Sequence, residues 1–308
     1  MAALASNRRQ FLKFLGTAAV IGSVAPNVWA GAAGKNASLT ILHTNDVHSR
    51  LDPFPMDGSR NAGKGGVARR ATLVQKIRQE NPNVLLFDAG DIFQGTPYFN
   101  LYKGEPEILA MNRLGYDAGT IGNHDFDGGI DNMVTQFGKA KFPLLIANYD
   151  FKNTVLDGRT KPWQVFEKDG IRVGVFGLGI QPEGLIPKDA YREMKYLDPV
   201  EIGNDTAAKL RSAEACDYVI CLSHLGYKYD NEPKVSDVVL AGKTRNIDLI
   251  IGGHTHTFLD APVVANNLDG QPIWINQVGF AGINLGRIDL MFERGKATLT
   301  GQSVEVKS

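Results

Sequence analysis

Gly122-Asn123-His124-Asp125-Phe126-Asp127 is the stretch of this chain that decides its fold and chemistry, because it places an amide, an imidazole and two carboxylates directly after a glycine. Glycine, asparagine and aspartate are also ordinary turn residues, so alone the stretch is equally compatible with a polar turn. Five of the six histidines, however, lie in short clusters of this character: Asp46-Val47-His48, the stretch itself, His224 and His254-Thr255-His256. Gly90-Asp91 adds one more carboxylate. Imidazole, carboxylate and amide oxygen all bind divalent ions, so the pattern predicts a metal site.

Composition describes an ordinary globular protein. The chain has 308 residues, of which 43% are hydrophobic and 21% charged, and its formal net charge is zero. This balance excludes a strongly basic nucleic-acid binder, and we expect no nucleic-acid partner. The two cysteines, Cys216 and Cys221, could pair only if the four residues between them bent sharply. We expect two free thiols, mostly buried, that bind no metal.

The first 30 residues have the features of a signal peptide of the twin-arginine type. Arg8 and Arg9 precede Phe11-Leu12-Lys13, an apolar run follows over residues 14–25, and Val28-Trp29-Ala30 offers a small-residue cleavage site. The apolar run is shorter than the roughly 20 residues that a membrane span needs, so we expect cleavage of the signal. Retention as an uncleaved membrane anchor is the alternative. We therefore expect a periplasmic or extracellular protein without a stable span after cleavage, with residues 31–37 as a leader and residues 38–308 as one catalytic domain.

Strands and helices alternate along most of the chain, which predicts an α/β fold. Short continuous apolar runs such as 84–87 are typical of buried parallel strands. The predicted helices are 67–79, 105–114, 130–139, 200–215 and 235–241. The predicted strands are 39–42, 84–87, 118–121, 144–146, 218–222 and 248–251, with a hairpin over 163–167 and 171–176. Four further strands, 262–265, 273–278, 288–292 and 297–306, follow without intervening helices.

The candidate ligands share one position relative to these strands. Asp46, Asp91, Asn123, His224 and His254 each follow closely on a predicted strand. Ligand sites of open α/β sheets form beyond the carboxyl ends of the strands, so five segments deliver these side chains to one edge. If the chain stays extended there, Asp46 and the histidine two residues later face the same ion. His43 lies within the first strand, where a structural, hydrogen-bonded histidine is expected.

The complete ordered set of motifs resembles the calcineurin-like metallophosphoesterase superfamily. The flanking sequence Leu42-His43-Thr44-Asn45-Asp46, the stretch 122–127 and Gly252-Gly253-His254-Thr255-His256-Thr257 resemble its 5′-nucleotidase and UDP-sugar hydrolase branch. The resemblance covers residues 38–308. It implies a four-layer α/β/β/α sandwich, in which helices flank two mixed sheets and a two-metal site lies at their edge.

The resemblance also implies roles for individual residues. One ion would be bound by Asp46, His48, Asp91 and His256, and the other by Asp91, Asn123, His224 and His254. Asn123 and His124 would contact the substrate phosphate, and His124 would be catalytic, oriented by Asp127 or, as the alternative, by Asp125. Mixed nitrogen and oxygen ligands suit two divalent ions such as Mn, Zn, Co or Fe.

The implied function is an exported dinuclear-metal phosphoesterase that hydrolyses phosphate monoesters of small molecules, as 5′-nucleotidases do. Typical members of the branch have a second, C-terminal domain for the nucleoside, and we expect this chain to lack it. Two alternatives therefore accompany this prediction. The chain is a catalytic half that needs a separate substrate-binding chain, or it is a hydrolase similar to thiosulfohydrolases, which release sulfate from a carrier.

Overall fold

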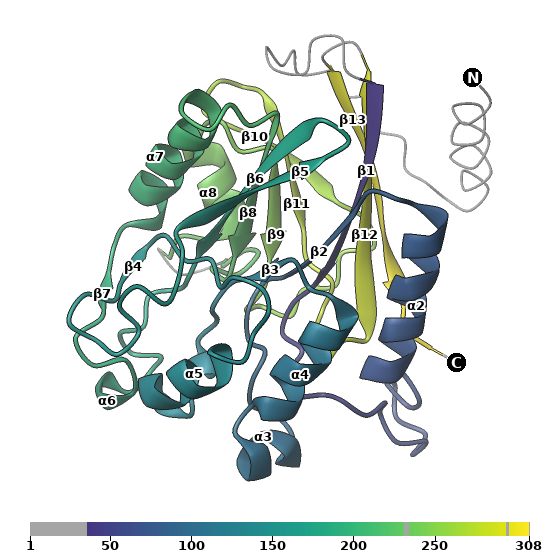
Figure 1. The fold of residues 1–308 in the computed structure, drawn as a ribbon, viewed down its shortest axis with the longest axis vertical. Helices are drawn as coiled ribbons and strands as arrows, with labels where there is room; N and C mark the ends of the chain where they lie inside the picture. The colour runs from purple at the N-terminus through teal and green to yellow at the C-terminus, as the bar shows by residue number, and fades with distance from the viewer. Residues whose placement is uncertain (1–35, 231–233, 294–295, 308) are drawn as a thin grey trace.

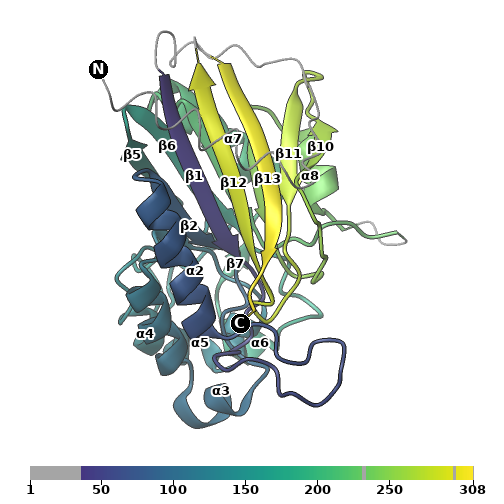
Figure 2. The ribbon, with the colours of Figure 1, turned by 90° about the vertical axis from the view of Figure 1, so that its right-hand side faces the viewer.

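The computed structural model describes residues 36–230, 234–293 and 296–307. In this part of the chain, two β-sheets pack face to face and helices cover their outer faces, as Figures 1 and 2 show from two directions. The predicted four-layer α/β/β/α architecture is thereby confirmed. The predicted signal peptide and residues 31–35 of the predicted leader lie outside the described residues.

The first sheet has five strands in the order β13-β12-β1-β2-β3. Strands β1, β2 and β3 run parallel, while β12 pairs antiparallel with both β1 and β13. Their bounds are β1 (Asn36–Thr44), β2 (Val84–Asp88), β3 (Ala118–Gly119), β12 (Asn284–Glu293) and β13 (Lys296–Glu305).

The second sheet has six strands in the order β10-β11-β9-β8-β6-β5. Strands β6, β8, β9 and β11 run parallel, and the two edge strands pair antiparallel with their neighbours. Their bounds are β5 (Trp163–Lys168), β6 (Ile171–Leu178), β8 (Tyr218–Ser223), β9 (Leu249–Gly252), β10 (Val263–Asn266) and β11 (Pro272–Asn276).

Helices and short elements complete the fold. The helices are α2 (Val67–Glu80), α3 (Pro97–Tyr102), α4 (Glu105–Leu114), α5 (Gly129–Phe137), α6 (Lys188–Tyr191), α7 (Pro199–Ser212) and α8 (Asp237–Lys243), with a 3₁₀ turn, η2 (His124–Phe126). Strands β4 (Tyr149–Asp150) and β7 (Lys195–Tyr196) form a separate two-stranded ribbon. Among the described helices, none is long and apolar enough to cross a membrane.

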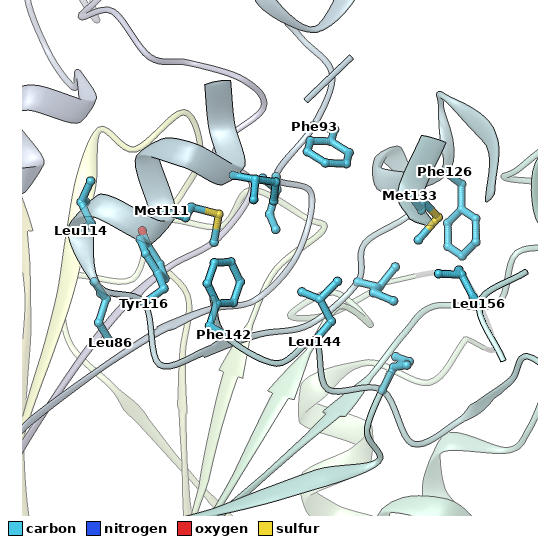
Figure 3. Packing of buried hydrophobic residues seen from close by; sticks show 14 of the residues in the cluster. Leu86, Phe93, Met111, Leu114, Tyr116, Phe126, Met133, Phe142, Leu144 and Leu156 are labelled. Carbon is cyan, nitrogen blue, oxygen red and sulfur yellow. The ribbon is translucent and has the colours of Figure 1, made fainter. Parts of the chain in front are cut away.

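Successive side chains of a strand point to opposite faces of its sheet, and this alternation produces three apolar layers between the four layers of secondary structure. In β2, Leu86 packs with the helices α2, α4 and α5, whereas Leu85 and Phe87 pack against the second sheet. This is the period-two pattern of a strand buried on both faces. Figure 3 shows the helix-side layer, where Leu86 lies among residues such as Met111 and Phe142. A third layer joins the second sheet to α7 and α8.

The prediction of a strand over 144–146 is wrong. Leu144 and Leu145 form only isolated bridges, to Gly119 and Lys161. The reason is that this segment crosses between the two sheets: the Leu145 N–H donates to Gly119 O, and the Ala147 N–H donates to Gly177 O in β6. Strand β3 is likewise shorter than the predicted 118–121.

Other differences concern short elements and ends. Helices α3 and α6 and the β4–β7 ribbon were not predicted, since each is too short to show a hydrophobic period. Strand β1 begins at Asn36, inside the predicted leader.

Cys216 and Cys221 are free and buried, as expected. His43 is fully buried and accepts a hydrogen bond at Nε2 from Asn276 Nδ2, 3.0 Å away, which confirms its structural character.

Candidate metal centre

The candidate ligands lie on loops that follow the carboxyl ends of strands in both sheets. These loops have an unusual backbone: Asp46, His48, Asp91, His254 and His256 all have positive φ, between 50° and 72°. Non-glycine residues rarely adopt this conformation, and its cost is retained mainly at functional sites. The expectation of an extended chain at 46–48 is therefore wrong. A left-handed turn, rather than strand alternation, brings these side chains together.

Asp46, His48 and His256 form the first group of potential ligands. The two imidazole Nε2 atoms lie 3.0 Å apart, and Asp46 Oδ1 lies 3.9 Å from that of His48 and 3.4 Å from that of His256. His48 Nδ1 faces the Phe93 carbonyl at 3.3 Å, where a proton on Nδ1 leaves Nε2 with its lone pair. Two nitrogens and a carboxylate oxygen that converge in this way suit a divalent cation.

Asp91, His224 and His254 form the second group. His224 is fully buried, and its Nδ1 donates to Ala89 O at 2.7 Å. Its Nε2 lies 3.2 Å from Asp91 Oδ2 but has no well-directed hydrogen bond within the described part of the chain. Asn123 Oδ1 completes the group, 2.7 Å from His254 Nδ1. A buried ring nitrogen without a well-directed hydrogen-bond partner fits a metal ligand, since buried polar atoms are otherwise almost always hydrogen-bonded.

Asp91 lies between the two groups. Its Oδ2 atom is 3.2 Å from His224 Nε2 and 3.8 Å from His48 Nε2, so one carboxylate oxygen faces a histidine of each group. Its neighbour in the fold, Asp46, is held by the His254 N–H, which lies 3.0 Å from each of its oxygens. The structure thus brings together all seven residues that the sequence predicted as ligands: Asp46, His48, Asp91, Asn123, His224, His254 and His256.

Charge in this cluster is balanced within the protein. Burial alone would raise the pKa of Asp91, but the imidazoles of His224 and His48 hold it well below its usual value. Burial alone would lower the pKa of His224, yet Asp91 raises it to about 10. Burial and the neighbouring His224 lower the pKa of His254 to about 4. The opposite charges of Asp91 and His224 thus stabilise each other, and a metal ion that binds His224 Nε2 must displace the proton held there.

Small and amide residues shape the cluster, and the sequence did not single out all of them. A side chain at Gly122 would overlap Asp91 Oδ1, so the close approach of the two loops requires glycine. The Asn45 amide donates to Asp46 Oδ2 and to Gly279 O, each at 2.6 Å. Gln277 donates to Gly253 O at 2.6 Å and accepts from the Thr257 N–H, which fixes the loop that carries two candidate ligands. Gln277 follows an ordinary strand, and no motif marks it.

His124 stands at the mouth of the cluster, outside both groups. Its side chain is 40% exposed, and its ring centroid lies 5.3 Å from that of His48. Asp127 Oδ2 is 2.9 Å from His124 Nδ1, and this hydrogen bond raises the pKa of His124. Asp125, the alternative partner, is turned inward and accepts backbone N–H groups instead. His124 is therefore a half-exposed imidazole whose protonated form is stabilised by one carboxylate.

An aromatic wall continues from the first group. Phe280 stacks on the His256 ring, with centroids 5.1 Å apart and planes 15° apart, and Phe258 meets Phe280 edge-on at 5.9 Å. The Ala281 N–H donates to Asp46 O at 2.7 Å, which anchors the loop that carries Phe280. The wall limits the orientations available to the exposed His256 ring. Sequence reasoning missed it, because a single phenylalanine after Gly279 carries no pattern.

Comparisons with known proteins agree with this geometry. Residues 39–258 match the family model described as calcineurin-like phosphoesterase. Snake venom 5′-nucleotidase of Naja atra is 35% identical over 84% of this chain and 51% of its own length, and human 5′-nucleotidase is 36% identical over 83% and 47%. The chain thus spans about half the length of these curated relatives.

Solved structures have the same fold. A 5′-nucleotidase precursor from Thermus thermophilus superimposes with a TM-score of 0.78 and 31% identity, over 87% of this chain and 54% of that one. The calcineurin-like phosphoesterase YfkN from Bacillus subtilis gives 0.71 and 30%, over 88% and 92%. A sulfate thiohydrolase from Thermus thermophilus, at 19% identity, is similar in fold alone. The chain therefore belongs to the calcineurin-like phosphoesterase family and is related to its 5′-nucleotidases.

Proposed function

We propose that this protein is a dinuclear-metal phosphoesterase that hydrolyses phosphate monoesters, with nucleoside 5′-monophosphates as its substrate class. The observation that carries the proposal is the pair of ligand groups on either side of Asp91, with His124 at their mouth. The family match and the 5′-nucleotidase relatives support the reaction class. The two ligand groups and His124 together suit hydrolysis of a phosphate ester. This reaction needs positive charge near the phosphate oxygens and an acid that protonates the departing oxygen.

The two groups would hold the ions as the sequence predicts. Asp46, His48 and His256 would bind one, Asn123, His224 and His254 the other, and Asp91 would be shared. When bound, two divalent ions supply positive charge to phosphate oxygens and acidify a bound water. Mixed nitrogen and oxygen ligand sets of this kind suit Mn, Zn, Co or Fe.

The side chains outside the ligand groups would act on the ester itself. His124 would donate its Nε2 proton to the departing oxygen, because Asp127 engages Nδ1 and stabilises the imidazolium. The amide of Asn123 lies on the same loop and would help to orient a phosphate oxygen. We further propose export through the twin-arginine signal in residues 1–30, which places the enzyme in the periplasm or outside the cell.

A substrate screen tests the proposed function. The purified mature chain, supplied with each divalent metal in turn, is assayed with nucleoside 5′-monophosphates, UDP-glucose, ribose 5-phosphate, bis-p-nitrophenyl phosphate and a sulfate thioester. We expect metal-dependent phosphate release, with the highest kcat/KM for a nucleoside monophosphate. Hydrolysis of the sulfate compound alone would refute the proposal. Activity that appears only after a second polypeptide is added would instead identify this chain as a catalytic half.

A further inference from the structure

Asp125 is the one acidic residue of the stretch 122–127 that the proposed reaction does not use, and its environment is specific. The side chain is completely buried and belongs to neither ligand group. Its carboxylate accepts hydrogen bonds from four backbone N–H groups: those of Asp91 at 3.1 Å, Ile92 at 2.9 Å, Phe93 at 3.1 Å and Gly122 at 2.8 Å. The Asp125 carboxylate is therefore held by hydrogen bonds from the protein backbone, next to the candidate metal centre.

The backbone of the receiving loop is shaped for this anion. Asp91 has φ of 55°, and the three consecutive N–H groups that start at this residue all point to the Asp125 carboxylate. Left-handed residues in such positions turn successive N–H groups towards one point and create an anion-binding concavity. Because the fourth donor, Gly122, belongs to the loop after β3, the carboxylate joins that loop to the one after β2.

The connection between the two loops is reciprocal. Asp91 Oδ1 accepts the backbone N–H of His124 at 2.8 Å, while Asp91 Oδ2 faces His224 Nε2 at 3.2 Å. One oxygen of the shared carboxylate is thus fixed to the second loop, and the other points into the centre. Because Asp125 holds the backbone of Asp91 and Asp91 holds the backbone beside Asn123, the two residues set the relative positions of ligands from both loops.

Only a carboxylate satisfies all four donors. An ionised carboxylate is an acceptor at both oxygens, with about four lone-pair directions. An asparagine would place its NH₂ group against backbone N–H groups and leave buried donors without an acceptor. We infer that Asp125 is a positioning residue of the metal centre: its carboxylate fixes Asp91 relative to Asn123, so the affinities for both ions depend on it although it touches neither ion nor substrate. The inference rests on the proposed metal centre.

Metal binding of the isosteric variant Asp125→Asn tests this directly. The full mature chain is dialysed against graded free Mn²⁺, and bound metal is counted by elemental analysis; the electron paramagnetic resonance spectrum then reports whether two ions share a ligand. We expect affinity for both ions to fall about 10- to 100-fold, the usual effect of losing a group that orients ligands. The signal of a coupled Mn²⁺ pair should weaken at metal levels that saturate the wild type.

Asp217→Asn is the matched control. Asp217 is also a buried carboxylate that accepts a backbone N–H, from Arg172 at 2.8 Å, but it precedes β8, at the end of that strand opposite His224. This variant should lose stability and keep wild-type metal affinity. If Asp125→Asn does not fold, Asp125→Glu retains the charge and should show a smaller loss of affinity for both ions.

Three outcomes would overturn the inference. Asp125→Asn could bind both ions with wild-type affinity, it could lose one ion alone, or it could lose no more affinity than Asp217→Asn. A wild-type protein that binds no ion pair would overturn it as well. The test uses no catalytic readout. A protein that binds two ions, loses both through Asp125→Asn and hydrolyses no phosphate ester would therefore refute the proposed function alone.

Discussion

Replacing His124 by alanine separates catalysis from metal binding. Both ligand groups are complete without this imidazole, so His124→Ala should keep both ions and fold normally. If His124 donates a proton to the departing oxygen, kcat should fall roughly 10²- to 10⁴-fold, the usual range for acid–base catalysis, with little change in KM. The loss falls on kcat because the proton is needed only as the phosphorus–oxygen bond breaks.

Asp127→Asn should have a smaller effect, whose size follows from the contact. The His124 Nδ1–Asp127 Oδ2 distance is 2.9 Å, but the two side chains are 40% and 34% exposed, so solvent screens the pair. A hydrogen bond to a charged group contributes about 1.5–3 kcal/mol when buried, and we take about 1 kcal/mol here. This corresponds to roughly a 5-fold decrease in kcat. The control is Asp131→Asn, which should change kcat little. Asp131 is an exposed carboxylate of α5 that pairs with Arg192.

The assay is steady-state hydrolysis of an alkyl phosphate and of p-nitrophenyl phosphate, with metal content measured on the same samples. The p-nitrophenolate group leaves without protonation, so it should partly rescue His124→Ala. Equal losses on both substrates would show that His124 acts on phosphoryl oxygens rather than as an acid. A lost ion, or full activity, in His124→Ala would refute the assignment of this residue altogether.

Three further predictions concern the approach of two loops, the pH profile and export. Gly122→Ala should destabilise the fold by about 1–3 kcal/mol and weaken metal binding, because a Cβ there overlaps Asp91 Oδ1; thermal unfolding with and without metal measures both, and unchanged metal binding would contradict the required close approach. The kcat of the wild type should fall as pH rises through the pKa of His124, since imidazolium is the acid. Asp127 raises that pKa, so Asp127→Asn should shift the falling part of the pH–kcat profile to lower pH. An unshifted profile would assign this ionisation to another group. Changing Arg8 and Arg9 to lysine should leave precursor in the cytoplasm, as cell fractionation would show, and normal export of that variant would indicate a general secretory signal.

The strands and helices with a clear hydrophobic period were predictable from the sequence. Runs such as 84–87 and 218–222 are apolar throughout because both faces of these strands are buried, between the second sheet and the helices or between the first sheet and α7 and α8. Some short elements, such as the helix α3 and the strand β4, have no measurable hydrophobic period. Segment 144–146 is apolar without being a strand, because its backbone hydrogen bonds are divided between Gly119 of β3 and Lys161, which precedes β5.

The candidate ligands were predictable because their residue types and their places after strands indicate metal chemistry. The backbone that presents them was not. The positive φ of Asp46 and His48 depends on tertiary hydrogen bonds with the next loop, including the one from the Asp46 N–H to Gly90 O at 2.9 Å, and local propensity favours the extended form. The supporting amides of Asn45 and Gln277 act only through contacts between distant segments, which one sequence does not reveal.

The number of metal ions per chain tests the central claim most directly. Elemental analysis of the fully loaded wild-type protein should give two divalent ions. Asp91→Ala should lose both, because this carboxylate faces a histidine of each group, whereas His48→Ala should weaken mainly one. At most one ion in a saturated wild-type sample, or two ions retained in Asp91→Ala, would contradict a centre built around a shared Asp91.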